Sequence, residues 1–467
     1  MSYALNEQLQ AAPLWEPELI KRYDRAGPRY TSYPTAADFK PQNAGSLLGL
    51  AEQRSDRSKP LSLYLHVPFC SSICYYCACN KIITRQHQRV RPFLDTLFQE
   101  LSYYAEHFAK GRTVEQLHFG GGTPTFLNDA EIAEVMVFLR KNFNLSTSAD
   151  ADFSIEIDPR SVDIARLGTL RELGFNRLSF GVQDTNLVVQ QAVNRIQPTA
   201  LIDEQLNAAR ELGFRSINFD LIYGLPKQNL MLFGETLNTV IGLRPDRICV
   251  FNYAHLPDRF RPQRHINDSD LPSPAEKLDI LGLSIERLLE AGYHYIGMDH
   301  FALPDDSLTS AQQDEMLHRN FQGYTTHGNC DLIACGPSAI GQLGDTYLQN
   351  AHDVDDWSEK VHRKGHAITR GIILSDDDIM RRALINQLIC HFQLDFSTFS
   401  EQWKIHFHTE FAHELSLMKP FSDDGLINLT DDGLYILPRG RLLIRSLCML
   451  FDIYRQPQTE QRFSRIV

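Results

Sequence analysis

Short apolar or alternating stretches recur through the middle of the chain, and longer stretches of helical periodicity separate them. This alternation is typical of βα units, in which helices connect parallel strands. The stretches that it predicts as strands are residues 61–69, 114–119, 153–157, 176–182, 216–222, 247–254 and 293–298. The pattern therefore predicts an α/β fold built around a mainly parallel sheet.

A short repeated segment predicts where successive helices of this region end. Residues 171–175 read RELGF and recur at 210–214, and a looser copy, EAGY, occupies residues 290–293. In each copy a glycine follows a helical run and precedes a strand, the usual place for a left-handed helix C-terminus. The copies predict consecutive connections of one sheet. The pattern alone leaves open whether that sheet is doubly wound or a partial barrel.

The flanking regions lack this repeat and predict two further parts. The polar opening segment contains residues 27–35 (GPRYTSYPT), whose glycine and prolines restrict it to a turn or extended path, so it is expected to pack on the main domain as an arm. From about residue 365 the pattern is helical and ends in an Asp-Gly hairpin at 423–437, as in a winged-helix-like module. The predicted domains are an N-terminal arm over 1–58, a main α/β domain over 59–364 and a mainly helical lid domain over 365–467.

Composition and charge narrow the class of protein. The 467 residues carry a formal charge of −12, from 46 basic and 58 acidic residues. An acidic chain with an acidic C-terminal hairpin is poorly suited to bind nucleic-acid phosphates. The first residues show no basic start followed by an apolar run, and no stretch reaches the roughly eighteen apolar residues of a membrane span. We therefore expect a cytoplasmic protein with neither a nucleic-acid nor a membrane partner.

Four of the nine cysteines lie within ten residues, directly after the first predicted strand. Cys70, Cys74 and Cys77 can direct three thiolates toward a common centre, and thiolates are the ligands that iron–sulfur clusters or zinc select. Cys79 lies two residues beyond Cys77, so its side chain is expected beside the centre and not as a ligand. Zinc bound by all four cysteines is the alternative, although the short step to Cys79 is awkward for a tetrahedral site.

Polar residues at predicted strand ends form a second group of candidates. Chemistry on such folds collects at the carboxyl ends of the strands. Glu156 alternates with isoleucines in its strand, and Gln183 and Asp220 lie among apolar neighbours. A carboxylate inside a sheet that is covered on both faces is costly unless it has a partner, which favours a site for Glu156 over a peripheral, solvated strand. Tyr64 also faces away from its apolar neighbours and is expected to project inward.

The glycine run at 120–122 follows the second predicted strand. Glycines let the backbone approach a ligand closely, although a bare run of three is often only a turn. The run does not have the spacing of a dinucleotide-binding fingerprint.

The cysteine spacing resembles the cluster loop of radical S-adenosylmethionine (SAM) enzymes. Together with Cys79, the stretches 27–35, 251–257, 297–301 and 318–326 make nearly the whole chain similar to the bacterial oxygen-independent coproporphyrinogen III oxidases. The resemblance implies a partial (β/α)6 barrel with an N-terminal arm and a winged-helix-like C-terminal domain. It also implies a [4Fe–4S] cluster held by Cys70, Cys74 and Cys77, with one iron open to SAM, and a catalytic role for Cys79.

The resemblance further implies the residues that bind two SAM molecules. The positions for the SAM on the cluster match Tyr64, Gly121, Glu156 and Ile340. The positions for a second SAM match Tyr76, Gly122, Thr123, Gln183, Arg195, Asp220 and Ala254. From the residues alone, a surface loop arginine is the favoured interpretation of Arg195.

The activity implied by the resemblance is the anaerobic oxidative decarboxylation of two propionates of coproporphyrinogen III to vinyl groups, which gives protoporphyrinogen IX through a 5′-deoxyadenosyl radical. A low-potential electron donor such as a flavodoxin or ferredoxin and a monomeric state are expected. Two alternatives stay open: a haem-trafficking relative without this activity and a zinc-stabilised binding module. The cysteine at 79 and the N-terminal arm favour the oxidase over the trafficking relative.

Overall fold

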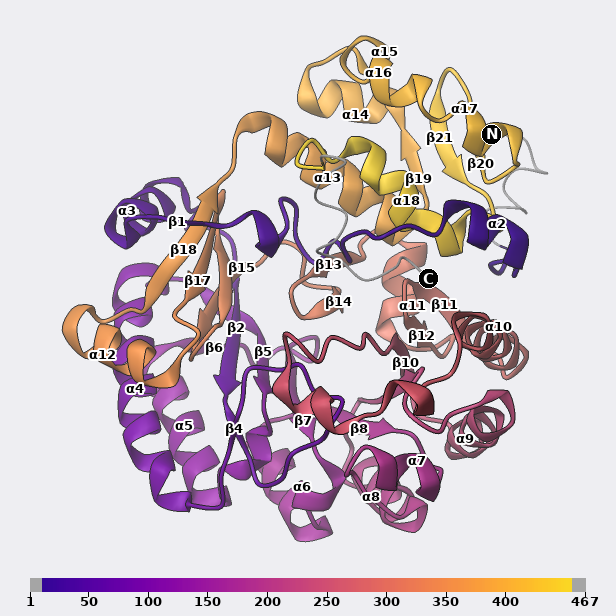
Figure 1. Cartoon of the computed structure of the whole chain (residues 1–467). Helices are drawn as coiled ribbons and strands as arrows, with labels where there is room; N and C mark the ends of the chain where they lie inside the picture. The colour runs from indigo at the N-terminus through magenta and orange to yellow at the C-terminus, as the bar shows by residue number, and fades with distance from the viewer. Residues whose placement is uncertain (1–10, 456–467) are drawn as a thin grey trace. The chain divides into compact units, whose positions relative to one another are not determined.

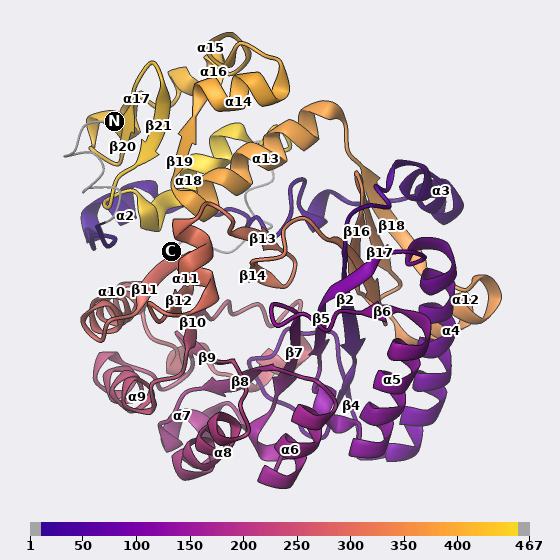
Figure 2. The same cartoon turned by 180° about the vertical axis from the view of Figure 1, so that it is seen from behind.

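The computed structural model describes residues 11–455, which form two compact units. The barrel unit comprises residues 39–273 and 329–373, and the split unit comprises residues 11–38, 274–328 and 374–455. Figures 1 and 2 show the chain from opposite sides. The sequence-based division into segments 1–58, 59–364 and 365–467 stays a prediction, because packing units need not follow the order of the chain.

Six parallel strands form the centre of the barrel unit and pair in the order in which they occur in the sequence. They are β2 (Leu61–Val67), β5 (Thr113–Gly121), β7 (Asp152–Ile157), β8 (Arg177–Gln183), β9 (Ser216–Tyr223) and β10 (Arg247–Asn252). Helices connect them, namely α4 (Val90–Phe108), α5 (Asp129–Asn142), α6 (Ile164–Glu172), α7 (Leu187–Ala192), α8 (Thr199–Glu211) and α9 (Leu230–Leu243). All six strands predicted for this region are confirmed.

The sheet continues beyond β2, so the strands do not close into a full barrel. The free edge of β2 pairs in parallel with β15 (Asp331–Cys335). Antiparallel strands then follow: β16 (Ile340–Leu343), β17 (Thr346–Asn350), β18 (Ile368–Ile373) and β1 (Lys40–Pro41). The remaining elements of this unit include α3 (Ala44–Arg54), α12 (Val354–Lys364), β3 (Phe69–Cys70), β4 (Ile82–Ile83) and β6 (Asn144–Leu145). The expected partial (β/α)6 barrel is therefore confirmed.

Local chemistry explains where the helices begin and end. At the start of α5 the side chain of Asn128 accepts a hydrogen bond from the Glu131 N–H, and the Glu131 side chain accepts one from the Asn128 N–H. This capping box satisfies amide groups that have no partner within the helix. At the repeated helix ends, Gly174, Gly213 and Gly292 have φ of 104°, 78° and 87°. These left-handed conformations confirm the helix ends predicted from the repeated segment.

The split unit packs the start of the chain against its C-terminal part. Its principal helices are α2 (Pro17–Tyr23), α10 (Pro274–Glu290), α11 (Ser307–Gln313), α13 (Asp376–His391), α14 (Phe396–Trp403), α17 (Lys419–Asp423) and α18 (Ile444–Cys448). Its strands are β11 (His294–Gly297), β12 (His300–Ala302), β13 (His318–Asn320), β14 (Gly323–Thr325), β19 (Gln393–Asp395), β20 (Ile427–Leu429) and β21 (Gly433–Ile436). Strands β20 and β21 are antiparallel, which confirms the predicted Asp-Gly hairpin.

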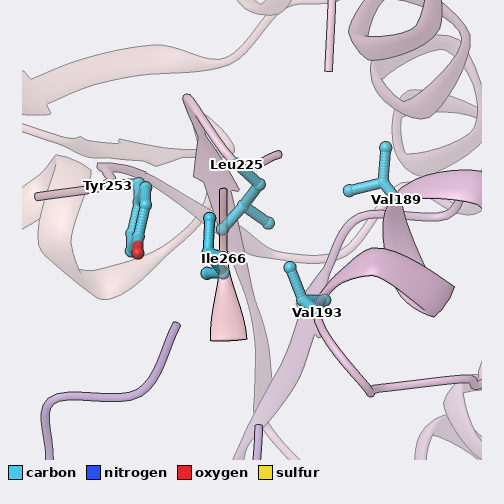
Figure 3. Close-up of a cluster of buried hydrophobic side chains, with 5 residues drawn as sticks. All are labelled: Val189, Val193, Leu225, Tyr253 and Ile266. Atoms are coloured by element: carbon cyan, nitrogen blue, oxygen red, sulfur yellow. The ribbon is translucent and has the colours of Figure 1, made fainter. Parts of the chain in front are cut away.

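A small hydrophobic cluster lies beside the cysteine loop in the barrel unit (Figure 3). It is formed by Val189, Val193, Leu225, Tyr253 and Ile266, with Tyr75, Tyr76, Ile222 and Leu271 packed against it. These residues come from α7 and the residue after it, from the end of β9, from the segments that follow β9 and β10, and from the loop itself. Burial of this apolar surface holds the loop against the carboxyl ends of the strands.

Within residues 11–455, no helix has the length and apolar character needed to cross a membrane.

A buried ion pair secures the N-terminal edge of β2. The Arg112 side chain is fully buried and donates to Asp331 Oδ2 at 2.7 Å, to Ser55 Oγ at 3.0 Å and to the Lys59 carbonyl at 2.7 Å. Arg112→Met would leave the Asp331 carboxylate buried without its charged partner. We expect the free energy of unfolding to fall by about 3–5 kcal/mol in anaerobic urea titrations. The control Arg363→Met removes an exposed pair with Glu359 and should cost less than about 1 kcal/mol; equal losses would contradict the assignment.

Candidate cofactor site

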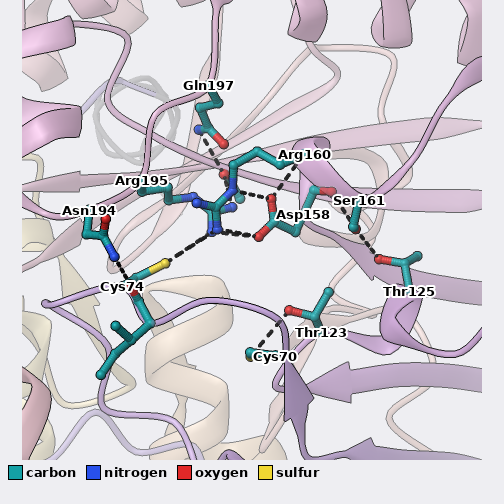
Figure 4. Close-up of polar contacts among 12 residues, drawn as sticks. Cys70, Cys74, Thr123, Thr125, Asp158, Arg160, Ser161, Asn194, Arg195 and Gln197 are labelled. Atoms are coloured by element: carbon teal, nitrogen blue, oxygen red, sulfur yellow. Dashed lines mark hydrogen bonds and ion pairs between the residues drawn. The ribbon is translucent and has the colours of Figure 1, made fainter. Parts of the chain in front are cut away.

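The cysteine loop leaves the barrel after β2 and is closed by short backbone hydrogen bonds. Strands β3 and β4 pair in parallel, and Ile82 N donates to the Pro68 carbonyl at 2.6 Å. Asn194 Nδ2 donates to the Ile73 carbonyl at 2.7 Å and so ties the loop to the end of α7 (Figure 4). The loop is therefore held at both its base and its middle, which places its three predicted ligand cysteines on a defined backbone.

Hydrogen-bond donors surround the sulfur atoms of this loop. Thr123 Oγ1 donates to Cys70 Sγ at 3.4 Å, whereas Arg195 Nη1 and Arg160 Nη2 donate to Cys74 Sγ at 3.5 and 3.6 Å (Figure 4). A hydrogen bond from Cys79 lowers the pKa of the Cys77 thiol to about 5. Donors of this kind stabilise anionic sulfur, the form that binds iron.

The described residues include no group of three or more His, Cys, Asp or Glu side chains placed to hold a single metal ion. A [4Fe–4S] cluster does not need such a group, because each of its thiolate ligands binds a different iron. The soft donor set and its hydrogen-bond donors fit a cluster.

A buried ion-pair network connects this loop to the ends of β7 and β8. Asp158 Oδ2 accepts from Arg160 Nη2 at 2.7 Å and from Arg195 Nη1 at 3.1 Å. Burial opposes ionisation of Asp158, but the two guanidinium groups outweigh it and lower the pKa of Asp158 to about 2. Arg195 also donates to the Gly181 carbonyl at 2.7 Å. Arg195 is 7% exposed, so the alternative of a surface loop arginine is wrong.

Glu156 lies at the centre of the sheet and already has polar partners. Strand β7 pairs with β5 and β8, which rules out a peripheral strand. Glu156 Oε1 lies 3.3 Å from His118 Nε2, and Oε2 accepts from Gly121 N at 3.2 Å. Burial opposes the charge of Glu156, but His118 and Gly121 outweigh it, so the pKa is lowered. The ring of Tyr64 stacks on His118 with centroids 5.8 Å apart. These contacts bring the predicted residues Tyr64, Gly121 and Glu156 together.

The glycines after β5 are required by packing within the protein. Gly121 has a φ of 116°, and a Cβ there would lie 2.8 Å from the ring of His66. A Cβ on Gly122 would lie 2.8 Å from the Phe69 carbonyl oxygen. Larger residues would therefore push the glycine loop away from the cysteine loop. The two loops are also joined by a hydrogen bond, because Thr123 N donates to the same Phe69 carbonyl at 2.8 Å.

Gln183 is the last residue of β8, and Asp220 lies within the neighbouring strand β9. Gln183 has a φ of 67°, and its buried Oε1 has no hydrogen-bond partner. Asp220 Oδ1 accepts from Asn218 Nδ2 at 2.8 Å and Oδ2 accepts from Ser179 Oγ at 3.1 Å. Burial raises the pKa of Asp220 to about 6. An amide oxygen without a hydrogen-bond partner and a carboxylate that can ionise can both accept hydrogen bonds from hydroxyl or ammonium groups of a ligand.

A residue that the sequence did not single out connects two predicted positions. Gln263 is 1% exposed, and its Nε2 donates to the Tyr76 carbonyl at 3.0 Å and to the Ala254 carbonyl at 3.2 Å. Its Oε1 accepts from Leu256 N at 2.6 Å. Gln263 therefore holds the end of the cysteine loop beside the segment that follows β10.

Glu100 performs a similar task on the other side of β2. This fully buried carboxylate on α4 accepts hydrogen bonds from Gly336 N at 2.8 Å, Asn350 Nδ2 at 2.7 Å and Trp357 Nε1 at 3.0 Å. The Asn350 side chain donates in turn to the Gly336 carbonyl at 2.8 Å. Glu100 thereby fixes the turn that leads into Ile340, the first residue of β16.

The site residues predicted from the sequence thus lie in one unit, on the strands of its sheet, in the loops that follow them and in the cysteine loop. Their roles in binding the cluster and SAM stay predictions. Sequence reasoning missed Arg160, Gln263 and Glu100. A buried acid within the apolar face of the helix at 90–108 was the available signal for Glu100.

The fold and this site agree with what the chain resembles. Residues 64–240 match the Radical SAM superfamily, and residues 374–443 match the HemN C-terminal domain. The protein therefore has the core of a radical SAM enzyme, with the three cysteines at the head of the matched segment.

Full-length relatives define the family more narrowly. Oxygen-independent coproporphyrinogen III oxidase from Pseudomonas aeruginosa is 52% identical over 97% of this chain and 99% of its own length. The enzyme of that name from Escherichia coli is 51% identical over 97% and 98%. A solved structure of coproporphyrinogen III oxidase from Escherichia coli superposes with a TM-score of 0.91 at 50% identity, covering 95% of this chain and all of that one. The chain belongs to the family of oxygen-independent coproporphyrinogen III oxidases.

The buried Glu100 predicts a distinctive pH dependence of stability. Burial raises the pKa of Glu100 to about 7, above the usual value of 4.5 for a glutamate, although its three donors oppose this shift. The folded protein then binds more protons than the unfolded chain between these values, so wild-type stability falls as the pH rises through this window. The loss amounts to at most about 3 kcal/mol.

Glu100→Gln cannot ionise and should remove this part of the pH dependence, in unfolding titrations from pH 4.5 to 8. Glu134→Gln, at an exposed carboxylate, should keep the wild-type slope. Parallel curves for wild type and Glu100→Gln would show that Glu100 does not titrate in this range.

Proposed function

We propose that this protein converts coproporphyrinogen III to protoporphyrinogen IX without oxygen, by oxidative decarboxylation of two propionate side chains to vinyl groups. The proposal rests on the sequence comparison: about half of the residues are identical, over nearly the full length, to those of oxygen-independent coproporphyrinogen III oxidases. A haem-trafficking relative is disfavoured because the chain retains Cys79 and the residues of the arm at 27–35.

Cys70, Cys74 and Cys77 would hold a [4Fe–4S] cluster, and Tyr64, Gly121, Glu156 and Ile340 would hold the SAM bound to it. When bound, the reduced cluster and SAM supply a carbon-centred radical that removes a hydrogen atom from the propionate β-carbon. Loss of CO2 from that side chain, with transfer of one electron to an external one-electron acceptor, would then leave the vinyl group. The chain's own residues bind and orient the reacting groups, and they exclude water from them.

The charges described above suit these tasks. The ionised Glu156 can accept hydrogen bonds from an ammonium or ribose hydroxyl group, and its Gly121 and His118 contacts fix its direction. Arg195 stays charged beside Cys74 because Asp158 compensates its burial, and a guanidinium so placed favours a carboxylate.

A second SAM molecule is part of the same proposal. Its residues would be Tyr76, Gly122, Thr123, Gln183, Arg195, Asp220 and Ala254. The link from Gln263 to Tyr76 and Ala254, and the unmatched Gln183 Oε1, support a second binding position here. The proposal also includes a cytoplasmic monomer that receives electrons from a low-potential donor such as a flavodoxin or ferredoxin.

An anaerobic assay with reductant, SAM and coproporphyrinogen III tests the function. We expect 5′-deoxyadenosine, CO2 and a tetrapyrrole with two vinyl groups. Formation of 5′-deoxyadenosine without a vinyl product would overturn the assignment of the substrate, but it would leave the assignment of radical SAM chemistry intact. Zinc without iron or sulfide in anaerobically purified protein would instead support the zinc-stabilised module.

Cys79→Ser separates catalysis from cluster binding. Cys79 is exposed and is predicted to be no ligand, so iron and sulfide contents should equal those of wild type. Vinyl formation should fall by about a hundredfold or more, because the side chain with the predicted catalytic role is lost. Cys330→Ser, outside the cysteine loop, is the control and should retain both properties. Loss of iron from Cys79→Ser would contradict the three-ligand assignment.

A further inference from the structure

The split unit buries a guanidinium group whose hydrogen-bonding capacity is largely unused. Arg319 belongs to β13 and is 8% exposed, yet its Nε and Nη1 atoms are buried without any hydrogen-bond partner. On the neighbouring strand β14, Tyr324 lies opposite, and the Arg319 Cζ is 4.7 Å from the centre of its ring. The aromatic ring stabilises the charge from one side but accepts no hydrogen bond from Nε or Nη1.

The backbone around Arg319 is firmly held, so the side chain cannot easily turn away. Asn386 Nδ2 on α13 donates to the Arg319 carbonyl at 3.1 Å. The Tyr324 hydroxyl reaches the Ile389 carbonyl on the same helix at 3.3 Å. Burying an unmatched cation is strongly unfavourable unless an anion completes its hydrogen bonds. A carboxylate fits best, because its two oxygens match two parallel N–H groups of a guanidinium.

Other arginines strengthen the positive field at Arg319. Arg445 is 5% exposed and donates to the carbonyls of Gly27 and Pro28. Burial, together with the positive charges of Arg29 and Arg319, lowers the pKa of Arg445 to about 10, although Asp299 opposes this shift. Arg29 forms an ion pair with Asp299. Three guanidinium groups and one carboxylate therefore interact in this unit, and their net positive charge favours an added anion.

The position of Arg319 in the chain points to the substrate and not to SAM. Arg319 belongs to the split unit, whereas all residues predicted to bind the cluster and SAM belong to the barrel unit. In the barrel unit, Arg195 already offers a guanidinium for a SAM carboxylate. We propose that Arg319 binds a propionate carboxylate of the tetrapyrrole substrate, an inference that rests on the proposed function.

The test uses the full-length protein loaded with its cluster under anaerobic conditions. Coproporphyrin III, the oxidised and unreactive form of the substrate, is titrated against wild type, Arg319→Gln and Arg319→Lys, with binding followed by fluorescence. The control is Arg22→Gln, which makes the same charge change at an exposed arginine of the same unit. Iron content, melting temperature, the KM for SAM and the KM for coproporphyrinogen III are measured on each variant.

We expect Arg319→Gln to weaken coproporphyrin III binding and to raise the KM for coproporphyrinogen III by ten- to a hundredfold. Arg319→Lys keeps the charge without the two-pronged geometry and should show a smaller loss. Arg22→Gln should stay within twofold of wild type, and iron content and the KM for SAM should not change in any variant.

Unchanged coproporphyrin III binding in Arg319→Gln would overturn the inference, as would a raised KM for SAM alone. If Arg319→Gln does not fold, Arg319→Lys decides, since unchanged binding there would also overturn it. A wild type that neither binds nor converts the tetrapyrrole would refute the proposed function together with this assignment. Conversion by wild type with normal binding by the Arg319 variants would refute the assignment alone.

Discussion

Parallel pairing of six strands in sequence order is the constraint on which the candidate site depends. Because the carboxyl ends of parallel strands lie along one edge, it gathers Gly121, Glu156 and Asp220 from distant parts of the chain. Charges gathered at a buried edge are stable only when paired. The Asp158–Arg195 pair meets this requirement and extends to the Cys74 sulfur, so the sheet and the cysteine loop share one electrostatic network.

Features with a local signal could be predicted from the sequence. Alternating apolar residues identified the six central parallel strands but not β15, and the repeated glycines identified left-handed helix ends. Cysteine spacing identified the loop. The glycine run was found too, but its interpretation was incomplete: the sequence suggested room for a ligand, whereas Gly121 and Gly122 are also required by contact with His66 and Phe69.

Features that depend on distant partners could not be predicted. Glu100 meets Gly336, which lies 236 residues later, and Gln263 meets Tyr76, which lies 187 residues earlier. No local pattern encodes such a pairing. The residues that position the site were therefore not predicted, whereas several residues of the site itself were. Arg319 was overlooked for the same reason, since only packing shows that its charge is buried and its donors are unmatched. The division of the chain into interleaved units is likewise a property of packing.

The split unit combines the beginning and the end of the chain, which affects how the protein folds while it is being synthesised. Arg22 pairs with Asp424, 402 residues later, and Ser446 donates to the Tyr23 carbonyl across 423 residues. The opening segment leaves the ribosome first but cannot complete its packing until nearly the whole chain has been made. The parallel strands of the barrel unit can pair in order during elongation, whereas closure of the split unit is delayed to the end. A truncated chain would therefore expose the arm without the surface that receives it.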